Sequence, residues 1–133
     1  MKKARPATAA ASRGGAYDRL RVLAPSVVDA YEALTAATRD AGPLGATSVA
    51  LFKVAVSIGR GSSRTTHAHA RKALELEVDP DVLRHIPIVA LPTIGLPAAL
   101  DAMRWIDESI AEFEAKTPAA TTRRPPAPRR SRR

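Results

Sequence analysis

Residues 46–58, Ala-Thr-Ser-Val-Ala-Leu-Phe-Lys-Val-Ala-Val-Ser-Ile, decide the fold expected of this 133-residue chain. At 100° per residue their apolar side chains surround a helix on nearly all sides, and such a helix is usually a central, buried one. Gly59-Arg60-Gly61 ends it. Lys53 is its only charged residue. Because lysine is seldom fully buried, we expect its ammonium group to reach a surface or a cavity.

Other helices on either side of this stretch can be placed by proline, glycine and capping residues. We expect a kink or a break at Pro87, because proline lacks the N–H donor and clashes with the preceding turn. Pro92 and Gly95–Pro97 predict a turn. No stretch alternates like a strand, so the predicted class is all-α, with about five to six helices. The predicted ranges are 25–40, 46–58, 62–76, 81–86 and 97–115.

The spacing of apolar residues predicts which face each helix buries. On the helix over 62–76, His69 lies on the inward stripe and His67 points away from it. Trp105 projects from the polar face of the last helix, either into solvent or into a subunit contact. The expected buried faces are Val27, Tyr31, Leu34 and Thr38; then Ser62, Thr65, His69, Ala73 and Leu76; then Leu100, Met103, Ile106, Ile110 and Phe113.

The net charge of +8 belongs to the two ends of the chain. Residues 1–16 carry four basic side chains and no acid, residues 116–133 carry seven and no acid, and residues 17–115 have a net charge of −3. Neither end has the large apolar residues that would offset the entropy of ordering. We therefore expect disordered basic tails over 1–16 and 116–133, around a helical domain over 17–115.

Composition excludes several kinds of protein. The chain has no cysteine, so it has no disulfide, no thiolate metal site and no thiol redox cycle. No apolar run approaches the ~18 residues of a membrane span, and the basic N-terminus lacks the apolar core of a secretory signal. We therefore expect a cytoplasmic protein. His67 and His69 diverge on a helix, so no metal site is expected either.

The C-terminal tail, residues 116–133, offers a second kind of partner. Seven positive charges could bind nucleic acid by releasing counterions, with an affinity that falls steeply as salt rises. No aromatic residue is interleaved there to stack on bases. Nucleic-acid binding is therefore less favoured than a solubilising extension.

Four segments together resemble the carboxymuconolactone decarboxylase family, which includes the alkylhydroperoxidase D-like proteins. They are Gly42-Pro43-Leu44, the buried helix ending in Leu51–Ser57, the stretch His69-Ala70-Arg71-Lys72-Ala73-Leu74, and Gly95-Leu96-Pro97-Ala98-Ala99. Their order and spacing match over about residues 40–110. The resemblance implies a compact all-α domain that forms oligomers, commonly homotrimers or hexamers. A modest core of about 99 residues agrees with that, since burial between subunits would supplement it.

The chain departs from the peroxidase members of the family at their reactive positions. The two cysteines of their Cys-x-x-Cys motif fall on Ser62 and Thr65, and the histidine that follows falls on His69. A glutamate common at the start of the buried helix falls on Ala50. Hydroxyl groups cannot run thiol–disulfide chemistry, so we expect no thiol peroxidase activity. Decarboxylase-type members do without the cysteines.

The resemblance therefore implies a cofactor-free decarboxylase or lactone-acting enzyme for a small carboxylated molecule. His69 would transfer the proton, and Lys53, Ser62 and Thr65 would bind the substrate. Two alternatives stay open. His69 could be a core histidine hydrogen-bonded to Ser62, Thr65 or a backbone carbonyl. The chain could also be a catalytically degenerate member that serves as an oligomeric scaffold or binding module.

Overall fold

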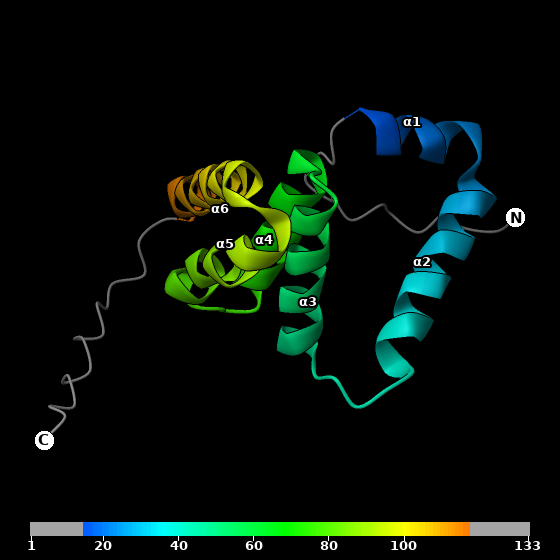
Figure 1. The fold of residues 1–133 in the computed structure, drawn as a ribbon. Helices are drawn as coiled ribbons and strands as arrows, with labels where there is room; N and C mark the ends of the chain where they lie inside the picture. The colour runs from blue at the N-terminus through cyan, green and yellow to red at the C-terminus, as the bar shows by residue number, and fades with distance from the viewer. Residues whose placement is uncertain (1–14, 118–133) are drawn as a thin grey trace, which may run out of the picture. The chain divides into compact units, whose positions relative to one another are not determined.

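The computed structural model describes residues 15–117, and this part of the chain is helical with no strand, which confirms the predicted all-α class. Most of the two predicted basic tails lies outside the described residues, as does the arginine-rich stretch proposed for nucleic acid. The described residues form six helices (Figure 1): α1 (Ala16–Leu23), α2 (Pro25–Asp40), α3 (Ala46–Gly59), α4 (Ser63–Glu75), α5 (Pro80–Ile94) and α6 (Leu96–Lys116).

Two compact units make up the described chain, one ending at Leu44 and the other beginning at Gly45. The first unit contains α1 and α2, which pack against each other. The sequence pattern does not predict α1 as a helix of its own. The chain leaves helical geometry at Ala24 and then starts α2 at a proline, a residue well suited to the first turn of a helix.

Polar contacts hold α1 on α2. The Tyr17 hydroxyl donates to the Glu32 carboxylate at 2.8 Å, and the Arg21 guanidinium pairs with the same carboxylate. The Arg21 guanidinium carbon also lies 5.7 Å from the centre of the Tyr17 ring. Val28 is the one buried side chain in these two helices, so the unit has almost no hydrophobic core.

The second unit is built on α3, which contacts α4, α5 and α6. Figure 1 shows these three helices gathered on one side of α3. Their shared core centres on Val54, Ile58, Leu83, Ile106 and Ile110, each at most 2% exposed. This apolar core is what positions α4, which carries the candidate site.

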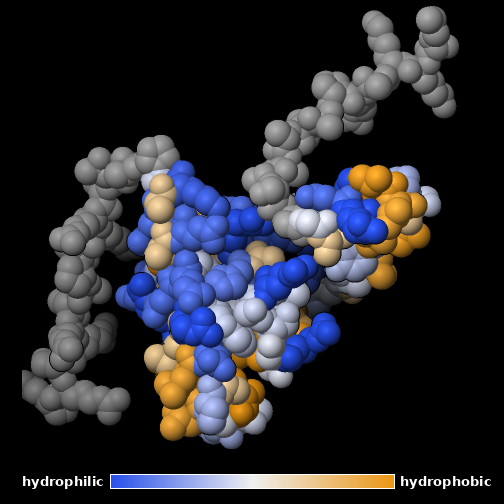
Figure 2. All heavy atoms as spheres, turned by 90° about the horizontal axis from the view of Figure 1, so that it is seen from above, coloured by the Kyte–Doolittle hydropathy of each residue, from blue (hydrophilic) through white to orange (hydrophobic). Residues whose placement is uncertain are grey.

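Within the second unit, α3 is not buried on nearly all sides as expected. Phe52 and Val56 are 62% and 45% exposed. The three partner helices of this unit cover only one face of α3, so the unit leaves the opposite, apolar face uncovered. Figure 2 shows patches of hydrophobic residues in orange beside hydrophilic residues in blue.

Helix α6 buries small residues where large ones were expected. Ile106 and Ile110 are buried as predicted, but Leu100 and Met103 are 54% and 39% exposed. The rest of the buried face consists of Ala99, Ala102 and Ser109. Small side chains on α6 meet Ala70 and Ala73 of α4 in the same core, which lets these two packed helices approach closely. The predicted buried face of α6 is therefore only partly correct.

Helix α5 is continuous from Pro80 to Ile94, so the expected break at Pro87 is wrong, and Pro92 lies inside the helix and not in the turn. Each proline removes a backbone donor, which costs the helix an internal hydrogen bond. Pro87 and Leu83 are both buried, and this tertiary packing keeps the segment helical. The predicted turn does occur at Gly95, whose φ of 87° suits glycine.

An ion pair ties α6 to α5 at the surface. The Arg84 guanidinium of α5 binds the Asp107 carboxylate of α6 at 3.0 Å and the Asp81 carboxylate at 2.9 Å. Hydrogen bonds to Asp107 and then to Asp81 raise the pKa of Arg84. Because these groups are exposed, each pair adds only a little stability.

Among the described residues, no helix combines the length and the apolar character that a membrane crossing requires.

Candidate functional site

His69 lies in the middle of α4, half-buried where α4 packs against α3. Burial lowers the pKa of His69 below the ordinary value of 6.5, and the positive charges of Lys72 and then Lys53 lower it further. Within residues 15–117 its ring makes no hydrogen bond to another side chain or to the backbone. At neutral pH His69 is therefore a neutral imidazole with an available nitrogen, which is what a proton acceptor requires.

Lys53 supplies the positive charge on the α3 side of this site. Its side chain is half-buried, as expected for the only charged residue of an apolar helix. No carboxylate in the described part of the chain pairs with Lys53. A cation that has lost part of its hydration and has no counterion attracts an anion. The charge of Lys53 also lowers the pKa of His69, so the two groups interact electrostatically.

Ser62 and Thr65 lie at the start of α4, on the turns that precede His69, and both are half-buried. The Ser62 hydroxyl caps the helix by accepting from the Thr65 backbone N–H at 3.4 Å. The Thr65 hydroxyl donates to the Ser62 carbonyl at 3.3 Å. Neither hydroxyl bonds to His69. The alternative of a core histidine held by Ser62 or Thr65 is therefore not supported by a hydrogen bond.

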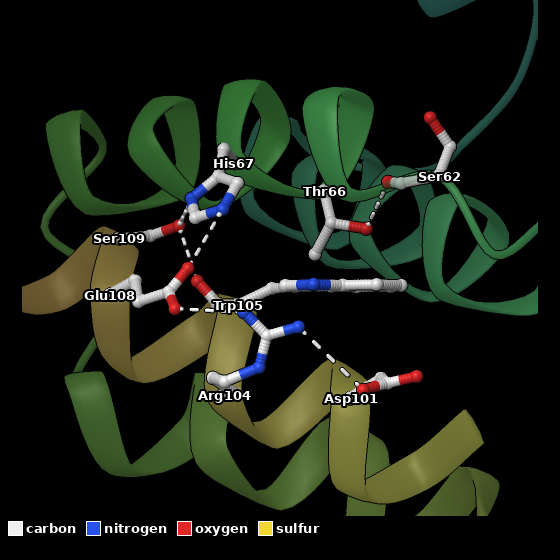
Figure 3. Close-up of polar contacts among 8 residues, drawn as sticks. All are labelled: Ser62, Thr66, His67, Asp101, Arg104, Trp105, Glu108 and Ser109. Atoms are coloured by element: carbon white, nitrogen blue, oxygen red, sulfur yellow. Dashed lines mark hydrogen bonds and ion pairs between the residues drawn. The ribbon is translucent and has the colours of Figure 1, made fainter. Parts of the chain in front are cut away.

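His67 does not point away from the protein, and that expectation is wrong. Its side chain is half-buried against α6 (Figure 3), with Nδ1 2.7 Å from the Ser109 hydroxyl and Nε2 3.3 Å from the Glu108 carboxylate. Ser109 is 4% exposed, and its hydroxyl donates to the Trp105 carbonyl at 2.8 Å. His67 is therefore a link between α4 and α6.

Sequence reasoning missed this link because the two sides of it are 42 residues apart. The predicted inward stripe of α4 is shifted by about one residue, since the fully buried positions are Thr66, Ala70, Ala73 and Leu74. Leu76, expected to be buried, is 47% exposed. As a result both histidines lie at borders of the buried face. His67 lies on the α6 side and His69 on the α3 side.

Trp105 also lies near the contact between α4 and α6. It was expected to project from the polar face of α6. It is half-buried and packs against the hydrophobic core of its own unit. In Figure 3 its indole ring lies between α6 and α4, beside Thr66. The large apolar ring is therefore used within the chain, and the expectation of a solvent-facing position is wrong.

Ala50 of α3, the position to which the family resemblance assigns a glutamate, is 8% exposed in the hydrophobic core. A methyl group there cannot exchange a proton. The described residues also contain no cluster of three histidine, cysteine, aspartate or glutamate side chains that could hold a metal ion.

Comparison with known proteins gives one match. The family model described as "Carboxymuconolactone decarboxylase family" matches residues 25–108, which include α2 to α5 and the first half of α6. No curated protein and no solved structure matches the chain at a significant level.

Proposed function

Because this chain belongs to the carboxymuconolactone decarboxylase family, we propose that it is a cofactor-free enzyme acting on a small carboxylated or lactone-like molecule. His69 is the proton-transfer group, and Lys53 draws in the substrate carboxylate. The observation that carries this proposal is a half-buried histidine whose pKa is lowered by burial and by two neighbouring lysines. A neutral imidazole beside positive charge suits a reaction that binds an anion and moves a proton.

The chemistry follows from these groups. The carboxylate of the substrate is attracted by the ammonium group of Lys53, with Lys72 adding to the positive potential. Loss of CO₂ leaves an electron pair on the adjacent carbon, and that carbon must take up a proton. His69 accepts a proton from an acidic position of the substrate and returns it to this carbon. The anion left at the acidic position then takes up a proton from water, so each CO₂ released consumes one proton from solvent. General acid–base catalysis of this kind typically contributes 10²–10⁴-fold to the rate.

Ser62 and Thr65 would bind the uncharged part of the substrate. Their hydroxyl groups are engaged in the helix cap, but each oxygen keeps a lone pair that can accept a hydrogen bond. This assignment extends the family resemblance to the positions that hold cysteines in peroxidases. Hydroxyl groups there cannot form a disulfide, so the proposal contains no thiol peroxidase step.

A second candidate function is a catalytically degenerate family member that acts as an oligomeric scaffold or binding module. Two observations favour it: the buried Ala50 in place of a carboxylate, and hydroxyl groups committed to a helix cap. The family resemblance also predicts a homotrimer or hexamer, and the sequence predicts a cytoplasmic location. These remain predictions.

Replacing Lys53 with methionine tests the carboxylate anchor. Methionine keeps much of the length and the apolar stem, and it removes the charge. A hydrogen bond to a charged group contributes about 1.5–3 kcal/mol, so KM for a γ-lactone carboxylate should rise about 10- to 100-fold, with a smaller change in kcat. The measurement is the release of CO₂ against substrate concentration. Arg39→Met is the matched control, because it removes one exposed positive charge from α2.

The two candidate functions give different results in this assay. An unchanged KM in Lys53→Met, with normal turnover, would show that Lys53 does not bind the substrate carboxylate. It would not test the role of His69. No CO₂ release by the unmodified chain from any lactone carboxylate or 3-oxo acid would favour the scaffold.

A further inference from the structure

A cluster of three polar side chains at the contact between α4 and α6 takes no part in the function proposed for His69. It consists of His67 of α4 and of Glu108 and Ser109 of α6 (Figure 3). The cluster lies on the border of α4 that faces α6, within the second unit, whereas His69 lies on the border that faces α3. What the cluster does is therefore independent of the chemistry proposed for His69.

The contacts of this cluster need three protons. The Ser109 hydroxyl donates its only proton to the Trp105 carbonyl at 2.8 Å, so the 2.7 Å contact between Ser109 and Nδ1 of His67 needs a proton on that nitrogen. The Glu108 carboxylate, 3.3 Å from Nε2 of His67, only accepts, so an attractive contact needs a proton on Nε2 as well. A neutral imidazole carries one ring proton and an imidazolium carries two. Only the imidazolium satisfies all three contacts.

Loss of a ring proton costs the cluster one of these contacts. If Nδ1 keeps the remaining proton, the lone pair of Nε2 faces the negative charge of Glu108. If Nε2 keeps it, the Ser109 hydroxyl must turn from the Trp105 carbonyl toward Nδ1. Ser109 is 4% exposed, so water has little access to replace the lost contact. The two helices are therefore held together less firmly when the ring is neutral.

The charged groups around His67 come from both helices and have both signs. Its own helix contributes two arginines, one turn before it and one turn after it, and α6 contributes an arginine and two carboxylates. They are Arg64 and Arg71 of α4 and Arg104, Glu108 and Glu112 of α6. Lys53, the only charged residue of α3, acts on His69 at the opposite border. Among these residue types, histidine alone changes its charge between about pH 5 and 8.

We propose that His67 is a pH-sensitive switch of the contact between α4 and α6. At acidic pH the imidazolium bridges Ser109 and Glu108 and holds the two helices together. As the pH rises through the range between about 5 and 8, the ring loses a proton, one of the contacts is lost, and the helices loosen. A structural link without a titrating group would hold equally well over this range.

Trp105 provides a readout, because it is the only tryptophan of the chain and its indole ring lies between α4 and α6 (Figure 3). Its fluorescence in the full chain should change between about pH 5 and 8, and the change should be at least threefold smaller in His67→Gln. His85→Gln, at an exposed position of α5, should keep the change of the unmodified chain. No change in the unmodified chain, or equal changes in the two variants, would overturn the switch.

A second pair of variants keeps the histidine and covers the case in which His67→Gln does not fold. The amide of Glu108→Gln can donate to a bare Nε2 or accept from a protonated one, so it satisfies the ring in both states. The fluorescence change should therefore also fall at least threefold in Glu108→Gln. It should persist in Glu114→Gln, which removes an exposed carboxylate from another face of α6. Equal changes in Glu108→Gln and Glu114→Gln would contradict the proposal, because direct quenching by a protonated ring would survive in both.

Discussion

Replacing His69 with glutamine should lower kcat for CO₂ release about 10²- to 10⁴-fold, the usual contribution of a positioned general acid–base. Glutamine keeps polar atoms near the ring position but cannot exchange a proton at neutral pH. In the unmodified chain the rate should rise with pH through the His69 pKa, because the neutral imidazole is the active form. Burial and two lysines place that pKa below 6.5, so the rate should be level above neutrality.

His85→Gln is the matched control for this prediction, since His85 is exposed on α5 and lies outside the candidate site. Its kcat should stay within twofold of the unmodified chain. Equal activity of His69→Gln and His85→Gln, with both folded by circular dichroism, would show that His69 does not carry the chemistry.

Replacing Ile106 with alanine should lower the free energy of unfolding by about 2–5 kcal/mol, the typical cost of truncating a buried isoleucine. Ile106 is fully buried in the core shared by α3, α4, α5 and α6. Truncation removes apolar contacts and leaves a cavity that the surrounding helices fill only in part. Urea unfolding followed by circular dichroism measures the loss.

Ile88→Ala provides the comparison, because it makes the same chemical change at a position that is 51% exposed. We expect a loss well below that of Ile106→Ala. Equal losses would mean that the core assigned to the second unit is not what stabilises it.

Much of the fold could be predicted from the positions of proline and glycine. They gave the limits of α2, α3 and α6 to within about one residue, because these residues end or begin helices for local reasons. The predicted break does not occur at Pro87, where α5 continues through a buried proline. The prediction also missed α1, because the single residue Ala24 separates that helix from α2.

The buried faces were harder to predict than the helices. The pattern assigns large apolar residues to the core, but α4 and α6 meet through alanines and Ser109, and Leu100 stays exposed. The same difficulty in predicting buried faces applies to the histidines of the candidate site. A helical wheel shows that His67 and His69 point in different directions, but only the position of α6 reveals that His67 bonds to Ser109.

The resemblance supplied the role proposed for His69, but the electrostatic surroundings of this residue could not have been predicted from spacing alone. Lys72 is close in sequence, whereas Lys53 comes from another helix and acts on His69 only because α3 and α4 pack together. That long-range contact is what turns a histidine in a helix into a candidate proton acceptor.

The most direct test of this assignment is an NMR titration of the His69 ring in the unmodified chain. Resonances are assigned by comparison with His69→Gln, and chemical shifts are followed from pH 4 to 9. Desolvation and the charges of Lys72 and Lys53 predict a midpoint below 6.5. A midpoint at or above 6.5 would show that the ring is solvated or paired with an acid, and it would contradict the neutral imidazole on which the proposed chemistry depends.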